Sequence, residues 1–216
     1  MRVLQRWLPA AVIMLAVLTS VGLTVHAQVG KSLDVVDANT IPEKDLAGLP
    51  SVTPAIAKAL VAARPFTSIT ELNTFLLGQG LTAPQAMAIY EKVFVHINLN
   101  TATPEEILLV PGAGKKMVIE FREYRPWKTW AQFDKEIGKY VGAEATAKLA
   151  QYCFIPVNLN TASDADILSI PGAGARMVRE FKEYRPWKTP AQFEKEIGKY
   201  VGDKETKRLW RYVVIE

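Results

Sequence analysis

Most of this chain is a tandem repeat of about sixty residues, and the repeat restricts the possible folds more than any other feature. The segment that begins at Asn98 recurs from Asn158, after a shift of 60 residues, and roughly three-quarters of the aligned positions are identical. A fainter copy precedes both, with Leu49-Pro50 at the place of Val110-Pro111. Because a repeat of this length is one supersecondary unit, the sequence predicts three similar small units in tandem.

The repeat also predicts where the units begin and end. We expect a degenerate first unit over residues 28–96, a second unit over residues 97–156 and a third unit over residues 157–216. The connections between them, around His96-Ile97 and Pro156-Val157, are very short.

The first 27 residues have the form of a secretory signal peptide. Arg2 and Arg6 give a basic start, an apolar run follows from Trp7 to about Leu18, and Val25-His26-Ala27 places short residues where signal peptidase cleaves. Residues 1–27 therefore predict an exported protein located in the periplasm or elsewhere outside the cytoplasm. The alternative is an uncleaved N-terminal anchor, because the mildly apolar stretch up to Val25 approaches bilayer length. Only in that case is the membrane an expected partner.

The net charge does not by itself explain binding to nucleic acid. Without the signal peptide the chain keeps 24 of its 26 basic residues against 22 acidic ones, which leaves a net charge of +2. A nearly neutral protein is not drawn to DNA by its overall field. Any DNA binding must therefore come from the local placement of cations.

Cysteine and histidine are too scarce to build a reactive or metal-binding centre. Cys153 is the only cysteine, and its counterpart in the next repeat is Val213, so we expect a small buried apolar position. His26 and His96 are the only histidines. We predict neither a metal site nor a cofactor.

Helix-start signals and apolar spacing predict an all-α fold, with four short helices in each strong unit. Thr103 and Glu106 form a capping box ahead of a first helix over about 104–109. A second helix is expected over about 115–125, where Arg125-Pro126 breaks it. The remaining signals for helix starts and ends are Thr129 with Gln132, Tyr140-Val141-Gly142 and Tyr152 in this unit, Ser163 with Asp166 and Thr189 with Gln192 in the third, and Ser68 with Glu71 in the first.

A turn rich in glycine separates the first two helices of each strong unit. It reads Pro111-Gly112-Ala113-Gly114 in the second unit and Pro171-Gly172-Ala173-Gly174 in the third, and we call these two segments the glycine turns. Glycine permits backbone angles that other residues resist and lets a phosphate approach the main chain. The following helix begins with unpaired N–H groups and a partial positive charge, which suit an anion. The predicted phosphate-binding residues are Gly112, Ala113, Gly114, Lys115, Lys116, Gly172, Ala173, Gly174 and Arg176.

A site of this kind contacts phosphates and does not read base edges, so the expected partner is double-stranded DNA of any sequence. Salt should weaken such binding strongly. Two linked glycine turns should gain affinity through effective concentration.

The strong units resemble the tandem helix-hairpin-helix domains of the ComEA-like competence family. The matching segments are N-x-N-T-A at Asn98 to Ala102, P-G-x-G at Pro111 to Gly114 and the pair Tyr124-Arg125, all repeated sixty residues later. The resemblance implies DNA binding outside the inner membrane, a role in DNA uptake, and DNA-uptake or other envelope proteins as further partners. That family usually has a larger apolar residue where this chain has Ala113 and Ala173, and a second glycine-rich hairpin where this chain has only Gly142 or Gly202.

The first unit departs most from this pattern. Its turn reads Pro50-Ser51-Val52-Thr53-Pro54, without glycine and without a nearby base, so we interpret the unit as structural. It is similar in this respect to the extrinsic PsbU subunit of photosystem II, which uses a helix-hairpin-helix fold for protein docking. A structural or protein-docking module is therefore the alternative function. No enzymatic activity is predicted, because helix-hairpin-helix DNA glycosylases carry their catalytic Asp in a larger domain, for which a sixty-residue unit has no room.

Overall fold

The structure is a computed structural model that describes residues 34–216, so the predicted signal peptide or anchor lies outside the described residues. The described chain is mostly helical, with 56% of it in helices. Its ten helices are α1 (Glu43–Leu46), α2 (Pro54–Ala63), α3 (Ile69–Gly78), α4 (Ala83–Tyr90), α5 (Pro104–Leu108), α6 (Lys115–Glu123), α7 (Trp130–Ala150), α8 (Asp164–Leu168), α9 (Ala175–Glu183) and α10 (Pro190–Trp210).

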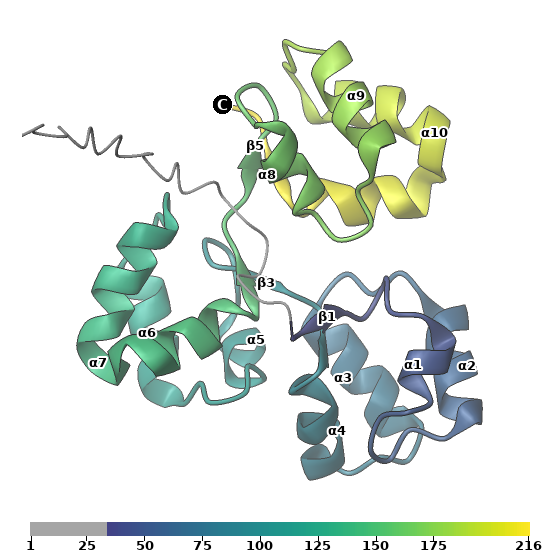
Figure 1. Ribbon diagram of the computed structural model, residues 1–216, viewed down its shortest axis with the longest axis vertical. Helices are drawn as coiled ribbons and strands as arrows, with labels where there is room; N and C mark the ends of the chain where they lie inside the picture. Colours follow the sequence, from purple (N-terminus) through teal and green to yellow (C-terminus); the bar gives the residue numbers. More distant parts are fainter. Residues whose placement is uncertain (1–33) are drawn as a thin grey trace, which may run out of the picture.

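Three short pairs of parallel strands, which side-chain periodicity did not predict, join the beginning of each repeat to its end. The pairs are β1 (Val36–Asp37) with β2 (Val93–Phe94), β3 (Ile97–Asn98) with β4 (Cys153–Phe154), and β5 (Val157–Asn158) with β6 (Val213–Val214). Strands of two residues are too short to display an alternating pattern. In the described chain the first unit is residues 34–96, the second 97–156 and the third 157–216, and Figure 1 shows them as three lobes.

The helices begin where capping side chains predict. The Thr103 hydroxyl accepts the N–H of Glu106 at 3.2 Å, and the Glu106 carboxylate accepts the N–H of Thr103 at 2.9 Å. Ser163 and Asp166 form the same reciprocal pair at the start of α8. The predicted caps at α3, α7 and α10 are confirmed as well, at Ser68, Thr129 and Thr189.

In the second and third units the predicted third and fourth helices form one bent element, without a loop between them. α7 is interrupted at Gly142, where φ is 78°, and α10 is interrupted at Gly202, where φ is 76°. A left-handed residue without a Cβ lets one helical segment end and the next begin without a loop. In the first unit the corresponding segments are the separate helices α3 and α4.

Large apolar side chains fill the core of each unit. Met117 and Phe121, which were predicted core residues, are buried, as are Trp127 and Trp187, which were predicted packed anchors. The indole N–H of Trp127 donates to the Phe121 carbonyl at 2.7 Å, so the buried ring keeps its polar atom paired. Trp187 does the same with Phe181.

Consecutive units pack through the same aromatic pair. The ring of Phe94 lies 5.0 Å from that of Tyr152, and the ring of Phe154 lies 4.6 Å from that of Tyr212, measured between centroids. Phe154 and Tyr212 stand sixty residues after Phe94 and Tyr152. The joints therefore repeat along with the units, and each buries aromatic surface between two neighbours.

Candidate phosphate-binding site

The two glycine turns have the same backbone geometry. Gly112 adopts a φ of 81°, in the left-handed region where a Cβ is strained. The N–H of Ala113 donates to the Val110 carbonyl at 2.9 Å, and Gly114, with an extended backbone, is the N-cap of α6. The third unit repeats this arrangement with Gly172 at a φ of 79°, Ala173 bonded to Ile170 at 2.9 Å, and Gly174 as the N-cap of α9.

The first turns of α6 and α9 lack the side-chain cap that other helices of the same units have. Gly114 and Gly174 have no side chain to accept a hydrogen bond. Helices α5, α7, α8 and α10 instead begin at residues whose hydroxyls accept from the third helical N–H, namely Thr103, Thr129, Ser163 and Thr189. In α6 the N–H of Met117 donates to the Gly114 carbonyl at 2.9 Å, so the N–H groups of Lys115 and Lys116 are the ones left for an external acceptor such as a phosphate oxygen. The first N–H groups of α9 are left in the same way.

Cations stand beside these N–H groups in unequal number. Lys115 and Lys116 are both exposed in the first turn of α6, whereas the first turn of α9 has only Arg176, after an alanine. The Lys116 ammonium lies 4.4 Å from the centre of the Tyr140 ring, and the Arg176 guanidinium lies 4.6 Å from that of Tyr200. The predicted site residues of each unit thus lie together, and the second unit has the greater positive charge.

The first unit keeps the shape of the turn, but the start of its helix differs. Ser51 holds the place of Gly112 with a φ of 64°, an uncommon conformation for a residue with a side chain. Thr53 holds the place of Gly114, and its hydroxyl accepts the N–H of Ile56 at 3.3 Å. Pro54, the first residue of α2, has no N–H, so the start of this helix offers one donor fewer than the start of α6.

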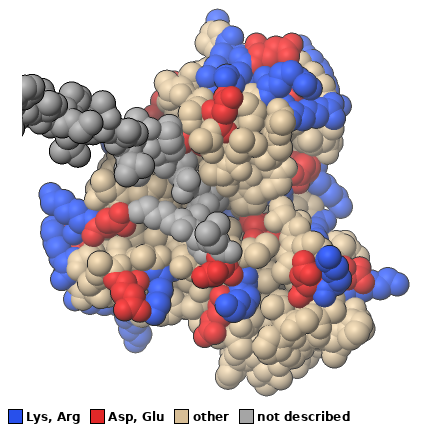
Figure 2. Space-filling model, in the orientation of Figure 1, with Lys and Arg blue, Asp and Glu red and all other residues tan. Residues whose placement is uncertain are grey.

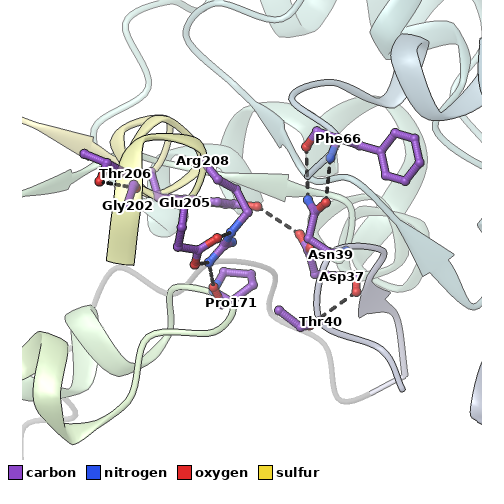
Figure 3. Close-up of polar contacts among 10 residues, drawn as sticks. Asp37, Asn39, Thr40, Phe66, Pro171, Gly202, Glu205, Thr206 and Arg208 are labelled. Carbon is purple, nitrogen blue, oxygen red and sulfur yellow. Dashed lines mark hydrogen bonds and ion pairs between the residues drawn. The ribbon is translucent and has the colours of Figure 1, made fainter. Parts of the chain in front are cut away.

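The surroundings of the two glycine turns differ sharply. A Cβ built on Gly112 would have no atom within 4 Å, whereas one built on Gly172 would lie 2.9 Å from Nη2 of Arg208 and 3.3 Å from Cγ2 of Thr40. Thr40 belongs to the first unit, and Figure 3 shows it beside Pro171 of the third-unit turn. The second-unit turn is open, while the third-unit turn is flanked by α10 on one side and the first unit on the other.

Arg208 on α10 donates a hydrogen bond to a backbone carbonyl of the third-unit turn. Only 1% of this residue is exposed, and its Nη2 donates to the Pro171 carbonyl at 2.6 Å. The same guanidinium pairs with both carboxylate oxygens of Glu205, at 2.6 and 2.7 Å (Figure 3). The second unit has Lys148 at this place, an exposed side chain that pairs with Glu144 on its own helix.

A buried polar network joins the first unit to the third. The Asp37 carboxylate accepts the Tyr212 hydroxyl at 2.9 Å and lies 3.3 Å from Nδ1 of His96. Nη2 of Arg211 donates to the His96 carbonyl at 3.0 Å. Burial raises the pKa of Asp37, but the interactions with His96, the N–H of Asn39 and Arg208 together outweigh burial and place that pKa below its usual value. Asp37 therefore stays charged at neutral pH, and the network keeps the first unit beside the third-unit turn.

Two of the motifs that suggested a DNA-binding family serve the fold. Nε and Nη2 of Arg125 donate to the carbonyls of Leu99 and Ala102 at 2.8 and 2.7 Å, so this cation is not directed at solvent. The side-chain amide of Asn100 bonds both the N–H and the carbonyl of Trp127. The first unit, which has no glycine turn, makes equivalent contacts through Arg64 and Asn39, and the third through Arg185 and Asn160.

Other features of the described residues do not suggest a second chemistry. They contain no group of three or more His, Cys, Asp or Glu side chains placed to bind a metal ion. None of their helices is both long enough and apolar enough to span a bilayer. Cys153 is buried, as predicted, and burial raises the pKa of its thiol. Comparison with protein-family models, curated proteins and solved structures finds no match, so the glycine turns themselves are the basis for assigning a function.

Proposed function

We propose that this chain is a tandem helix-hairpin-helix protein that binds double-stranded DNA by its phosphate backbone and does not read base sequence. The glycine turn of the second unit carries the proposal. There, uncapped N–H groups at the start of α6, exposed glycine backbone and two exposed lysines occupy one open corner. These are the donors and charges that an anionic oxygen requires.

The setting of this activity is proposed from the sequence. The signal-peptide pattern of residues 1–27 favours export, and the resemblance to the ComEA-like family favours a part in DNA uptake outside the cytoplasm. The protein is proposed to bind without catalysing a reaction.

A protein-docking role is the second candidate, and it is favoured for the first unit alone. The turn of that unit is capped by its own Thr53, and its Asp37 is engaged by Tyr212 of the third unit. In the face shown in Figure 2, the largest area without charged side chains lies over the first unit. These features suit contact with protein better than contact with a polyanion.

Fluorescence anisotropy with labelled duplexes tests the proposed function. Residues 28–216 are titrated into two duplexes of unrelated sequence across a series of salt concentrations. We expect equal affinities for the two duplexes and a linear fall of log K with log salt, with a slope of about −0.9 for each phosphate neutralised. Absence of binding at the lowest salt would refute the proposal and leave docking as the better candidate.

A variant that copies the cap of the first unit locates the site. Gly114 has an extended backbone, with φ at −101°, and its Cβ would meet no atom within 4 Å, so Gly114→Thr should fit. The new hydroxyl would accept the N–H of Met117, as Thr53 accepts that of Ile56, and the new side chain would cover the adjacent N–H groups of Lys115 and Lys116. We therefore expect DNA affinity to fall about tenfold. Stability should change by only a few tenths of a kcal/mol, because threonine and glycine are similar N-caps. Unchanged affinity in Gly114→Thr would exclude these N–H groups as the site.

A further inference from the structure

A pair of tyrosine hydroxyls connects the end of the second helix to the middle of the long helix in both strong units. The hydroxyls of Tyr124 and Tyr140 lie 2.9 Å apart, and those of Tyr184 and Tyr200 are also 2.9 Å apart. Hydrogen bonds with Tyr124 and with the carboxylate of Glu120 raise the pKa of Tyr140. Tyr140 therefore keeps its proton, and its hydroxyl is bonded to that of Tyr124.

The acid in this network is buried in both units. Glu120 is 8% exposed and Glu180 is 3% exposed, and each keeps one carboxylate oxygen without a hydrogen-bond partner. Burying an incompletely paired carboxylate costs stability. A cost that appears twice at the same place favours a role beyond the packing of the unit.

The tyrosine ring carries the cation of the glycine turn on its face. Lys116 over Tyr140 and Arg176 over Tyr200, at 4.4 and 4.6 Å, are both within the range of a cation–π interaction. Lysine and arginine lose considerable rotamer freedom when they bind a ligand. A cation that already rests on a fixed ring loses less on binding, which favours affinity.

The first unit serves as an internal comparison. At the places of Lys116, Glu120, Tyr124 and Tyr140 it has Ala55, Ala59, Ala63 and Gln79. That unit nevertheless forms its four helices and closes its strand pair. The network is therefore absent where the glycine turn is absent, and the fold forms without it.

We propose that Tyr140 and Tyr200 are positioning residues for DNA binding, each holding the cation of its first helical turn beside the N–H groups of the glycine turn so that both reach the same phosphate. The proposal rests on the proposed function, and it adds Tyr124, Glu120 and their third-unit counterparts as the residues that fix the ring. The tyrosines themselves do not touch DNA in this scheme.

A double-mutant cycle in the second unit tests it. DNA affinity and its salt dependence are measured for residues 28–216 as wild type, Lys116→Ala, Tyr140→Leu and the double variant. We expect each single variant to lose about fivefold in affinity, and the double variant to lose no more than Lys116→Ala alone, because the ring acts only through the lysine. The salt slope should fall in magnitude by up to about one in Tyr140→Leu, as it does in Lys116→Ala.

Several outcomes would overturn the positioning role while leaving DNA binding intact. One is a Tyr140→Leu loss that is as large in the Lys116→Ala background as in the wild type. Another is a loss of affinity with an unchanged salt slope, which would mean that the ring contacts DNA itself. Wild-type affinity in Tyr140→Leu would also overturn it. Absence of binding by the wild type would instead refute the proposed function.

Conservative variants keep the test independent of folding. Tyr140→Phe retains the ring under Lys116 but loses the hydroxyl network, so we expect a loss of affinity smaller than that of Tyr140→Leu. Tyr90→Phe is the matched control, because it removes a tyrosine hydroxyl bonded to Asn73 at 2.9 Å in the unit without a glycine turn, and it should bind DNA as the wild type does. A Tyr140→Phe protein that matches Tyr140→Leu in affinity, with the wild-type thermal transition, would contradict the role of the ring face.

Discussion

The glycine turns of the second and third units have the same four residues and the same backbone, yet their surroundings are not alike. Nothing lies within 4 Å of a Cβ placed on Gly112, whereas Gly172 is flanked by Arg208 and by Thr40 of the first unit. A repeat can therefore duplicate a turn without duplicating its surroundings. The difference arises from residues outside the motif.

Arg208 and the residues that bond the first unit to the third are positions where the repeat is broken, whereas Thr40 has threonine at the equivalent positions of the other units. Asp37 stands where the other units have asparagine, and His96 stands where the next joint has proline. Arg208, Glu205 and Arg211 replace Lys148, Ala145 and Gln151 of the second unit. Asp37, His96 and Arg211 take part in the contacts between the first and third units. Arg208 and Glu205 bond to each other within the third unit, and Arg208 also bonds the Pro171 carbonyl of the turn. The chain thus combines one open turn with one flanked turn.

Charge reversal should separate the two turns most strongly. Lys115→Glu with Lys116→Glu removes both cations of the open turn, and we expect DNA affinity at low salt to fall about 30-fold or more. Arg176→Glu at the flanked turn should lower affinity by about threefold. Lys58→Glu, on the corresponding exposed helix of the first unit, is the control and should have little effect. Equal losses from the two turns, measured by anisotropy, would show that their accessibility does not govern binding.

Alanine in place of the left-handed glycine measures how closely the third-unit turn is packed. Gly112→Ala should destabilise the protein by about 1 to 2 kcal/mol through backbone strain alone. Gly172→Ala should cost about 1 kcal/mol more, because its methyl group meets Arg208 and Thr40. Chemical denaturation followed by circular dichroism gives both values. If the two variants were equally stable, the third-unit turn would have as much space as the second.

Releasing the first unit should produce a smaller gain in binding. Tyr212→Phe with Arg211→Gln removes the hydrogen bonds to Asp37 and His96 while keeping the ring that packs on Phe154. The third-unit turn would then be more accessible, and we expect DNA affinity to rise about threefold through a second contact on the same molecule. Tyr152→Phe is the control at the equivalent joint. A fall in affinity in the double variant would mean that contact with the first unit assists binding.

The parts of the structure encoded within a few residues were predictable from sequence. Each such signal depends only on neighbouring residues, as in the capping pair Thr103 and Glu106, the helix break at Arg125-Pro126 and the turn from Pro111 to Gly114. The all-α class and the composition of each turn could therefore be predicted. The two-residue strands join segments nearly sixty residues apart and carry no periodic pattern. The neighbours of Gly172 were also out of reach, because Thr40 lies 132 positions before it, and their contact depends on how the units pack.

Amide NMR during a titration with duplex DNA tests the phosphate-binding turn most directly. With ¹⁵N-labelled protein, we expect the largest shifts at the N–H groups of Gly114, Lys115 and Lys116, smaller ones at the start of α9, and none at Ile56, whose N–H is bonded to Thr53. Shifts confined to other surfaces, or as large at Ile56 as at Lys116, would contradict the assignment of the second unit's glycine turn as the DNA site.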